Sequence, residues 1–262
     1  MFQLSPDPCF NFELLRILAH ASYSSGADVG EVLLAASEIE SGNFESWYQA
    51  FVKRAERVLL TASTSNFRDP VSVRDANFRA ATYFRAADFF LHADWQDERI
   101  NDLWKRQTEC FDRAMELLPV PGHRKLLPSA DGFDVPVIFF PAAADPSGEE
   151  KGKGKGISPR PTVILGNGFD GSMEELYHLH GAAALERGYN VVCYEGPGQP
   201  VVRREQGLGF THEWHKVVGP VLDYLETLPC IDMQKVALLG YSMAGVLAAR
   251  AAALEPRVKA CE

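Results

Sequence analysis

Residues 235–262, KVALLGYSMAGVLAARAAALEPRVKACE, decide the fold of this chain. An apolar run leads into Gly240 and Ser242, and an alanine-rich segment of helical character follows. A sharp turn between a strand and a helix exposes a serine in this way, and Ala244 stands where the pattern Gly-x-Ser-x-Gly has its last glycine. The stretch therefore predicts Ser242 as a nucleophile. The alternative is a structural serine in a tight turn.

Two backbone N–H groups are predicted to stabilise an oxyanion beside Ser242. The helix after the serine directs its N-terminus at the reaction site, which makes the N–H of Met243 one donor. The segment ILGNGFDGSMEELY, residues 164–177, follows another apolar run. Its glycines at 166, 168 and 171 let the backbone approach a ligand, and the N–H of Phe169 is the second expected donor.

The same loop carries Asp170, a candidate catalytic residue. A charged carboxylate beside an oxyanion hole is repulsive, so Asp170 is expected to be neutral, paired or used in proton transfer. A solvated loop aspartate is the alternative. The loop can also be a strand-to-helix turn in which Ser172 caps the helix and Glu175 completes a capping box. In the later turn YEGPGQP, we interpret Glu195 as structural.

The chain divides into two halves with different hydrophobic periods. Residues 1–121 show helical spacing at 28–40, 43–62, 71–93 and 97–118, with Asn43 placed as a cap. This predicts a helical bundle. A tetratricopeptide-like array is the alternative, although no repeat of that period is found.

Residues 122–262 contain short β-branched or aromatic runs at 134–142, 161–168, 190–196 and 235–242. Helical segments at 172–188 and 212–228 separate the later runs, which predicts an α/β fold with a mainly parallel sheet. The connection 143–160 contains no helix, so we expect the two strands that flank it to form an antiparallel hairpin. Its Lys/Gly run is expected to be a flexible surface loop.

Composition narrows the classes of function. A formal charge of −9 argues against sequence-independent binding to nucleic acid or to anionic membrane. No apolar run is long enough to span a bilayer and no secretory leader is recognised, so a cytoplasmic location is expected. The five dispersed cysteines indicate reduced thiols, and no metal site or cofactor is predicted.

Three motifs carry a family resemblance. Residues 161–178, 194–210 and 236–245, behind a helical N-terminal block, resemble the α/β-hydrolases typified by 2,6-dihydropseudooxynicotine hydrolase. The resemblance is closest to the fungal yellowish-green-type heptaketide hydrolases, which shorten polyketides. It implies an α/β-hydrolase fold with an N-terminal helical cap, residues 1–121, and a Ser-Asp-His triad that cleaves a carbon–carbon bond next to a ketone.

The resemblance also implies roles for individual residues. Ser242 becomes the nucleophile and Phe169 and Met243 the backbone donors, while Asp170 falls where the nicotine-degrading enzyme has an additional catalytic glutamate. The implied partner is a small polyketide or aromatic substrate, and no cofactor is implied.

The order of the triad in this fold is Ser, then Asp or Glu, then His. All seven histidines precede Ser242: His20, His92, His123, His178, His180, His212 and His215. We expect surface or packing roles for His178, His180, His212 and His215. The hydrolase fold is therefore expected to be incomplete, ending just after the nucleophile helix, with a bare sheet edge that makes homo-oligomers plausible.

The leading hypothesis is a truncated form of a serine hydrolase of secondary metabolism, including pigment biosynthesis, that cleaves a C–C bond or an ester. An esterase or thioesterase is the close alternative. A catalytically inactive homologue that binds a ligand or partner is the rival from another class, and a helical scaffold with an incidental α/β tail is a third.

Overall fold

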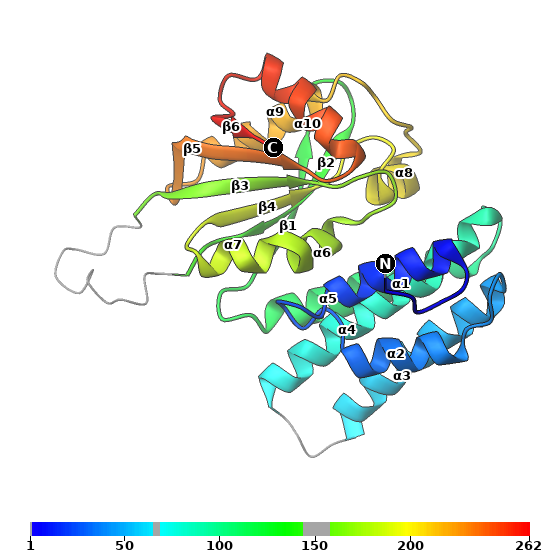
Figure 1. The fold of residues 1–262 in the computed structure, drawn as a ribbon. Helices are drawn as coiled ribbons and strands as arrows, with labels where there is room; N and C mark the ends of the chain where they lie inside the picture. The colour runs from blue at the N-terminus through cyan, green and yellow to red at the C-terminus, as the bar shows by residue number, and fades with distance from the viewer. Residues whose placement is uncertain (1, 65–68, 144–157) are drawn as a thin grey trace. The chain divides into compact units, whose positions relative to one another are not determined.

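The computed structural model describes residues 2–64, 69–143 and 158–262. The chain forms two compact units, Met1–Leu118 and Pro119–Glu262. Unit 1 is helical and unit 2 is built on a mixed sheet (Figure 1).

Unit 1 has five α-helices and one 3₁₀ turn in its described residues. They are α1 Pro8–Ala19, α2 Val29–Glu38, α3 Phe44–Thr64, α4 Pro70–Asp88, η1 Phe89–Ala93 and α5 Arg99–Glu116. The sequence predicted all but α1. The cap at Asn43 is confirmed, because its side-chain oxygen accepts the N–H of Ser46 at 3.1 Å. Asp7 caps the missed helix α1 in a similar way.

Helix α4 is the centre of unit 1. Every residue from Ala80 to Asp88 is buried, and α4 packs against both α3 and α5. Trp47 of α3 is fully buried, and its indole N–H donates to the carbonyl of Ala86 at 2.7 Å. The unit therefore has its own hydrophobic core.

Unit 2 contains a six-stranded sheet of order β1-β2-β4-β3-β5-β6. The strands are β1 His123–Pro128, β2 Asp134–Phe140, β3 Arg160–Gly166, β4 Asn190–Tyr194, β5 Ile231–Gly240 and β6 Ala260–Cys261. Strands β4, β3, β5 and β6 are parallel neighbours, whereas β2 is antiparallel to both β1 and β4.

The predicted hairpin between β2 and β3 is wrong. Strand β4 lies between them, and Ile138 of β2 is opposite Cys193 of β4. The hairpin partner of β2 is the unpredicted strand β1, because a short turn joins them in which the N–H of Ser129 donates to Phe133 at 2.8 Å. When a long connection joins two consecutive strands, they need not be neighbours in the sheet. The Lys/Gly run predicted as a surface loop lies outside the described residues.

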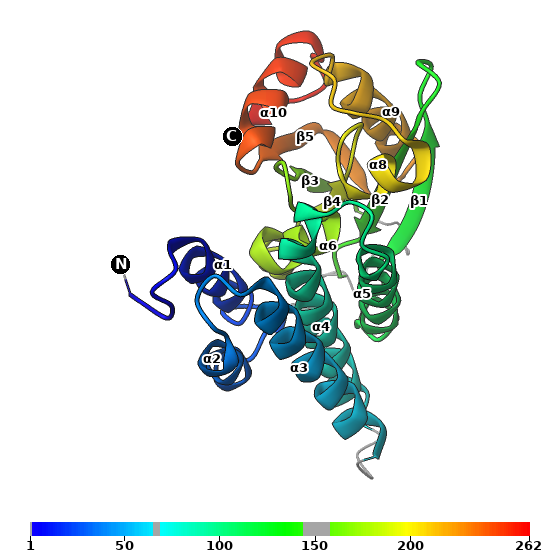
Figure 2. The same ribbon diagram turned by 90° about the vertical axis from the view of Figure 1, so that its right-hand side faces the viewer.

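Helices cover both faces of the sheet (Figures 1 and 2). On one face lie α6 Met173–Leu176, the π turn η2 Tyr177–Gly181 and α7 Ala182–Glu186; on the other lie α9 His215–Glu226 and α10 Met243–Leu254. The short helix α8 Pro200–Gln206 was not predicted. The predicted apolar face of the segment 212–228 is confirmed by a core of buried residues that includes Trp214, Val217, Val218, Val221, Leu222 and Leu225.

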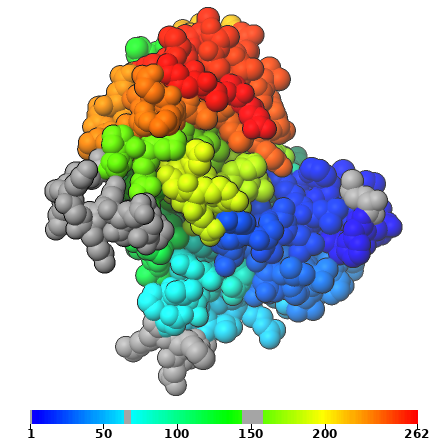
Figure 3. All heavy atoms as spheres, turned by 60° about the vertical axis from the view of Figure 1, so that its left-hand side comes forward, coloured from blue at the N-terminus to red at the C-terminus, as the bar shows by residue number. Residues whose placement is uncertain are grey.

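Strand β5 is an inner strand of the sheet and leads directly to α10. It pairs with β3 on one side, and on the other with the two residues of β6. The last residues of the chain, 259–262, are exposed and lie at the surface (Figure 3, red). This arrangement places the end of β5 beside the end of β3, where the predicted nucleophile and the predicted oxyanion loop are found.

Candidate active site

Ser242 occupies the turn between β5 and α10 in a backbone conformation that few side chains adopt. Its φ is 57° and its ψ is −122°, and among the described non-glycine residues only Ser25 shares a positive φ. Such a conformation is strained in a residue with a side chain, and strain of this kind clusters at functional sites. The turn leaves Ser242 exposed, as nucleophilic attack requires.

The turn is compact and requires small residues around the serine. A methyl group on Gly240 would lie 2.1 Å from the carbonyl oxygen of Ala244, and Ala244 is itself fully buried. The N–H of Ala244 donates to Tyr241 at 3.1 Å, and the N–H of Gly245 donates to the carbonyl of Ser242 at 2.9 Å. Alanine therefore fits where the usual pattern has its last glycine.

The glycine-rich loop after β3 lies against the serine. A methyl group on Gly168 would lie 3.0 Å from Cβ and 3.4 Å from Oγ of Ser242. The N–H of Tyr241 also donates to the carbonyl of Gly166 at 3.0 Å, which joins the ends of the two strands. The structure thus brings together two segments that lie more than seventy residues apart in the chain.

Gly166 and Gly171 of this loop are packed against protein side chains. A methyl group on Gly166 would lie 2.8 Å from the hydroxyl of Tyr194, and one on Gly171 would lie 2.2 Å from the amide oxygen of Asn167. Packing within the protein explains these two glycines. Of the three glycines predicted to admit a ligand, only Gly168 borders Ser242.

The predicted oxyanion donors are the backbone N–H groups of Phe169 and Met243. Met243 is the first residue of α10, and N–H groups in the first turn of a helix have no intrahelical partner. Neither N–H group donates a hydrogen bond to another described residue. Both groups are therefore available to a substrate oxygen, and their catalytic role stays a prediction.

Two side chains of the loop face solvent. Asp170 is exposed, and its predicted role in proton transfer stays a prediction. Phe169 is 68% exposed, and its ring stacks on that of Phe210 with centroids 5.6 Å apart and planes inclined by 20°. Phe210 comes from the loop after α8 and was not predicted as a site residue.

The buried side chain of Gln199 holds the oxyanion loop in place. Its amide nitrogen donates to the carbonyls of Asn167 and Gly168, the second at 3.2 Å. Its amide oxygen accepts the N–H of Gly196 at 2.8 Å. The YEGPGQP turn therefore supports the loop that borders Ser242. Residue spacing alone gave no sign of this role for Gln199.

Glu195 is structural, as predicted. Its fully buried carboxylate accepts the N–H of Met173, in the first turn of α6, at 2.9 Å and that of Val201 in α8 at 2.7 Å. Burial, and then the nearby carboxylate of Glu174, raise the pKa of Glu195 above its usual range. Ser172 occupies the N-cap position of α6 without a side-chain cap bond, so the predicted capping box is wrong. The N–H of Glu175 donates instead to the backbone carbonyl of Ser172 at 3.1 Å.

No histidine approaches Ser242 within hydrogen-bonding distance in the part of the chain that the structure describes. His180, on η2, makes an edge contact with the ring of Tyr241, with centroids 6.0 Å apart. Burial lowers the pKa of His180. His178 is buried within the same turn, and His92 binds Asp88 at 3.0 Å in unit 1.

The described ranges hold no group of three or more His, Cys, Asp and Glu side chains that could bind a metal ion. None of their helices is both long enough and apolar enough to cross a membrane. All five cysteines are free thiols, and burial raises the pKa of Cys193 on β4.

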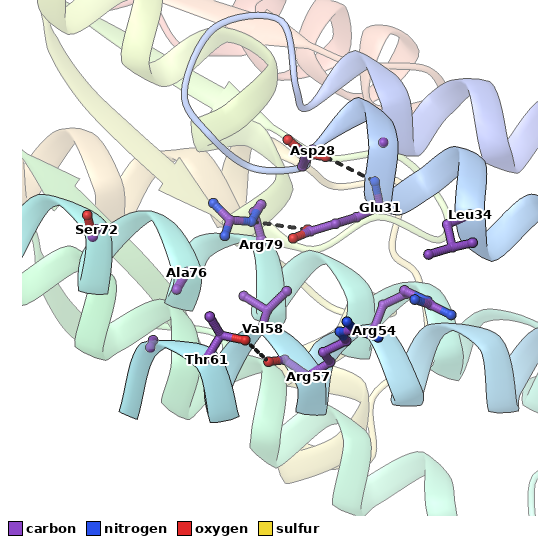
Figure 4. Close-up of a pocket in the computed structure, with 12 residues that line it drawn as sticks. Asp28, Glu31, Leu34, Arg54, Arg57, Val58, Thr61, Ser72, Ala76 and Arg79 are labelled. Carbon is purple, nitrogen blue, oxygen red and sulfur yellow. Dashed lines mark hydrogen bonds and ion pairs between the residues drawn. The ribbon is translucent and has the colours of Figure 1, made fainter. Parts of the chain in front are cut away.

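Unit 1 has a separate cavity of about 650 Å³ between α2, α3 and α4 (Figure 4). Charged side chains line it: Glu31 of α2 binds Arg79 of α4 at 3.1 Å, and Arg54 and Arg57 come from α3. Asp28 caps α2 at its rim. None of the predicted catalytic residues lines this cavity.

Comparisons with known proteins agree with the motifs. Residues 151–262 match the family described as "Esterase FrsA-like". The chain is 35% identical to "Hydrolase acrC" of Aspergillus aculeatus, over all of this chain and 62% of that protein. It is 36% identical to "20-hydroxy-prefusarin hydrolase FUS2" of Gibberella moniliformis, over 96% of this chain and 59% of that protein.

A solved structure shares the fold. The 2,6-dihydroxy-pseudo-oxynicotine hydrolase superposes with a TM-score of 0.73 and 24% identity, over 93% of this chain and 62% of that one. The chain spans about 60% of the length of the curated relatives it matches. The chain therefore has the α/β-hydrolase fold, and it resembles fungal hydrolases over 96% or more of its length and the 2,6-dihydroxy-pseudo-oxynicotine hydrolase over 93% of it.

Proposed function

We propose that this chain carries the nucleophile and the oxyanion donors of a serine hydrolase of fungal-type secondary metabolism. The observation that carries the proposal is the strained, exposed conformation of Ser242 at the end of β5, with the loop of Gly168 packed against it. The hydrolase names of the relatives support the reaction class. The substrate is a small polyketide or aromatic molecule with a carbonyl group.

The chemistry is acyl transfer through Ser242. Its Oγ attacks the carbonyl carbon while the hydroxyl proton passes to a general base, and the carbonyl oxygen becomes an oxyanion. The N–H groups of Phe169 and Met243 would stabilise that oxyanion, each donor being worth on the order of 10²–10³ in rate. The intermediate collapses by expelling an enolate carbon from a ketone, or an alkoxide from an ester. Water then releases the acyl group.

The proposed mechanism needs a general base for Ser242, and no described residue hydrogen-bonds its hydroxyl to serve as one. The triad order predicts an acid and a histidine that follow the serine, whereas all seven histidines precede Ser242. That this chain is a shortened form of a longer hydrolase stays a prediction. The intact mass of the native polypeptide tests it, together with the sequence of the 3′ end of its transcript.

One observation favours a second function. Within the described residues the hydroxyl of Ser242 has no hydrogen-bonded base, and a triad without its base retains only the residual catalysis of the oxyanion hole and of binding. The alternative is an inactive homologue that binds a small ligand or a partner chain. For either function we predict a cytoplasmic location and a capacity to form homo-oligomers. We predict no binding to nucleic acid or to membranes.

Labelling with a fluorophosphonate probe separates the two functions. An active serine is expected to react within minutes, and intact-mass analysis followed by peptide mapping should place the adduct on Ser242. Ser242→Ala is expected to abolish labelling. Ser25→Ala is the matched control, because Ser25 also has a positive φ but its hydroxyl binds Asp75 at 3.2 Å, far from the site in sequence. Folded protein that fails to label favours the inactive homologue when the intact mass of the native polypeptide equals that of these 262 residues, and the shortened form when it is larger.

A further inference from the structure

Phe169 and Phe210 form an aromatic wall beside Ser242. Their rings stack with centroids 5.6 Å apart and planes inclined by 20°. Both are exposed, Phe169 to 68% and Phe210 to 40%. Trp214 and Tyr194 of unit 2 are fully buried, whereas Tyr189 and Tyr241 are exposed to 38% and 37%. Phe169 and Phe210 are distinguished by being exposed and stacked on each other, with Phe169 on the loop that borders the nucleophile, and core packing does not explain such a pair.

The wall is held by a continuous set of contacts that ends at the serine. The ring of Phe210 lies flat against Gly198, where an added methyl group would meet ring carbons at 2.4 to 2.7 Å. Gly198 has a φ of 92° and its N–H donates to the carbonyl of Leu208 at 3.1 Å. The next residue, Gln199, binds the carbonyls of the oxyanion loop. The position of Phe210 is thus fixed by the turn that also fixes the loop.

Phe169 joins the wall to the predicted chemistry. Its backbone N–H is a predicted oxyanion donor, and the preceding residue, Gly168, borders Ser242. A substrate carbonyl whose oxygen accepts this N–H would therefore lie next to the residue that carries the Phe169 ring. The face of this ring that is turned away from Phe210 can accept a flat π-system, because aromatic rings prefer offset stacking at centroid distances of about 4.5–7 Å.

We infer that Phe169, supported by Phe210, selects substrates in which a planar aromatic ring lies next to the reacting carbonyl. This inference rests on the proposed function and narrows its substrate class from small polyketides and aromatic molecules to aryl ketones and aryl esters. Phe169 acts as a specificity residue by stacking, and Phe210 positions it. A saturated ring of the same size would fill the space but would lose the face-to-face contact.

The test uses binding, so that it does not depend on the nucleophile. The probe is 6-propionyl-2-(dimethylamino)naphthalene, a fluorescent aryl ketone, titrated against the full chain and against Ser242→Ala. It is then displaced with 2-acetylnaphthalene and with its saturated counterpart, 2-acetyldecalin. We expect both proteins to bind the probe, and the flat ketone to displace it at a concentration about 5- to 10-fold lower than the saturated one, as expected for one stacking interaction.

Three variants identify the source of that preference. Phe169→Leu keeps an apolar side chain without a π face and should abolish the preference, whereas Phe169→Tyr should keep it. Phe210→Leu should reduce it, because the supporting ring is lost. Phe2→Ala is the control, since Phe2 is 72% exposed in the other unit and should leave it unchanged. Circular dichroism checks that each variant is folded.

The outcomes separate this inference from the proposed function. A preference that survives in Phe169→Leu, or a probe that does not bind the folded chain, overturns the inference. In another outcome, the chain shows a preference for the flat ketone that depends on Phe169, while Ser242 does not react with fluorophosphonate. That result supports the inference about Phe169 and overturns only the proposal of an active hydrolase.

Discussion

Gly168 and Ser242 are in contact, although 73 residues separate them in the chain: a methyl group on Gly168 would lie 3.0 Å from the serine Cβ. The contact joins the loop after β3 to the turn after β5, and these two strands pair in parallel up to Gly166 and Gly240. Because carboxyl ends of neighbouring parallel strands meet at one edge of the sheet, the register itself brings the nucleophile and the oxyanion loop together.

Gly168→Ala is expected to impair Ser242 without unfolding the chain. The added methyl must displace either the loop or the serine, and a shift of about 1 Å in a catalytic group can cost up to about 100-fold in rate. The rate of fluorophosphonate labelling should fall by about 10- to 100-fold, while the melting temperature stays within a few degrees.

Gly209→Ala is the control for that substitution. A methyl group on Gly209 has no atom within 4 Å, so its labelling rate should match that of the unmodified chain. Equal labelling by Gly168→Ala and Gly209→Ala would show that the loop does not constrain the serine.

Gln199→Ala is expected to loosen the oxyanion loop and to destabilise unit 2. It leaves the carbonyls of Asn167 and Gly168 without their buried donor, which costs about 1–3 kcal/mol in the free energy of unfolding. Urea denaturation measures this loss. Gln206→Ala is a matched control, because the amide group of Gln206 also bonds backbone groups through its oxygen and its nitrogen, those of Asp134, but these bonds are exposed. A larger loss for Gln206→Ala would contradict the role given to Gln199.

Glu195 should make the stability of the chain depend on pH. Burial, then the carboxylate of Glu174, raise its pKa in the folded state above the ordinary value of 4.5, although the two N–H groups that it binds oppose this shift. A raised folded pKa means that the folded state holds the proton more tightly. This contribution is fully present below pH 4.5 and is lost as pH rises toward the folded pKa.

The measurement compares Glu195→Gln with the unmodified chain in urea at several pH values. The free energy of unfolding of the unmodified chain, relative to the variant, should decline as pH rises above about 4.5, the usual glutamate value. Glu205→Gln serves as control, because Glu205 is exposed on the same short helix. A difference that grows with pH would mean that the two N–H bonds outweigh burial and that the folded pKa is lowered.

Local patterns predicted the parts of the site that depend on local chemistry. Ser242 and its small neighbours stand next to one another in the sequence, so the strained turn follows from the order Gly, Tyr, Ser, Met, Ala. The apolar face of α9 was also predictable, since helical spacing places Val217, Val221 and Leu225 on one side.

Contacts between distant segments could not be predicted in the same way. The choice of β4 over β3 as the neighbour of β2 depends on the whole sheet. The role of Gln199 depends on two carbonyl groups that lie thirty-one and thirty-two residues away. A glutamine in a turn gives no local sign of such partners, and Phe210 in a glycine-rich stretch gives no sign that it will stack on Phe169.

Substitutions of Ala244 test how large a side chain the turn around Ser242 accommodates. Ala244→Gly restores the usual pattern and should keep the labelling rate, at a cost of about 0.5–1 kcal/mol because glycine is a poorer helix residue. Ala244→Val should lose about 1–3 kcal/mol through overpacking, since Ala244 is fully buried and lies against Gly240. It should also slow labelling, because any shift of the first turn of α10 moves the N–H of Met243. Ala249→Val, at an exposed position of the same helix, should do neither. A Val variant at 244 that labels and unfolds like the Ala249 control would mean that the turn is looser than its geometry indicates.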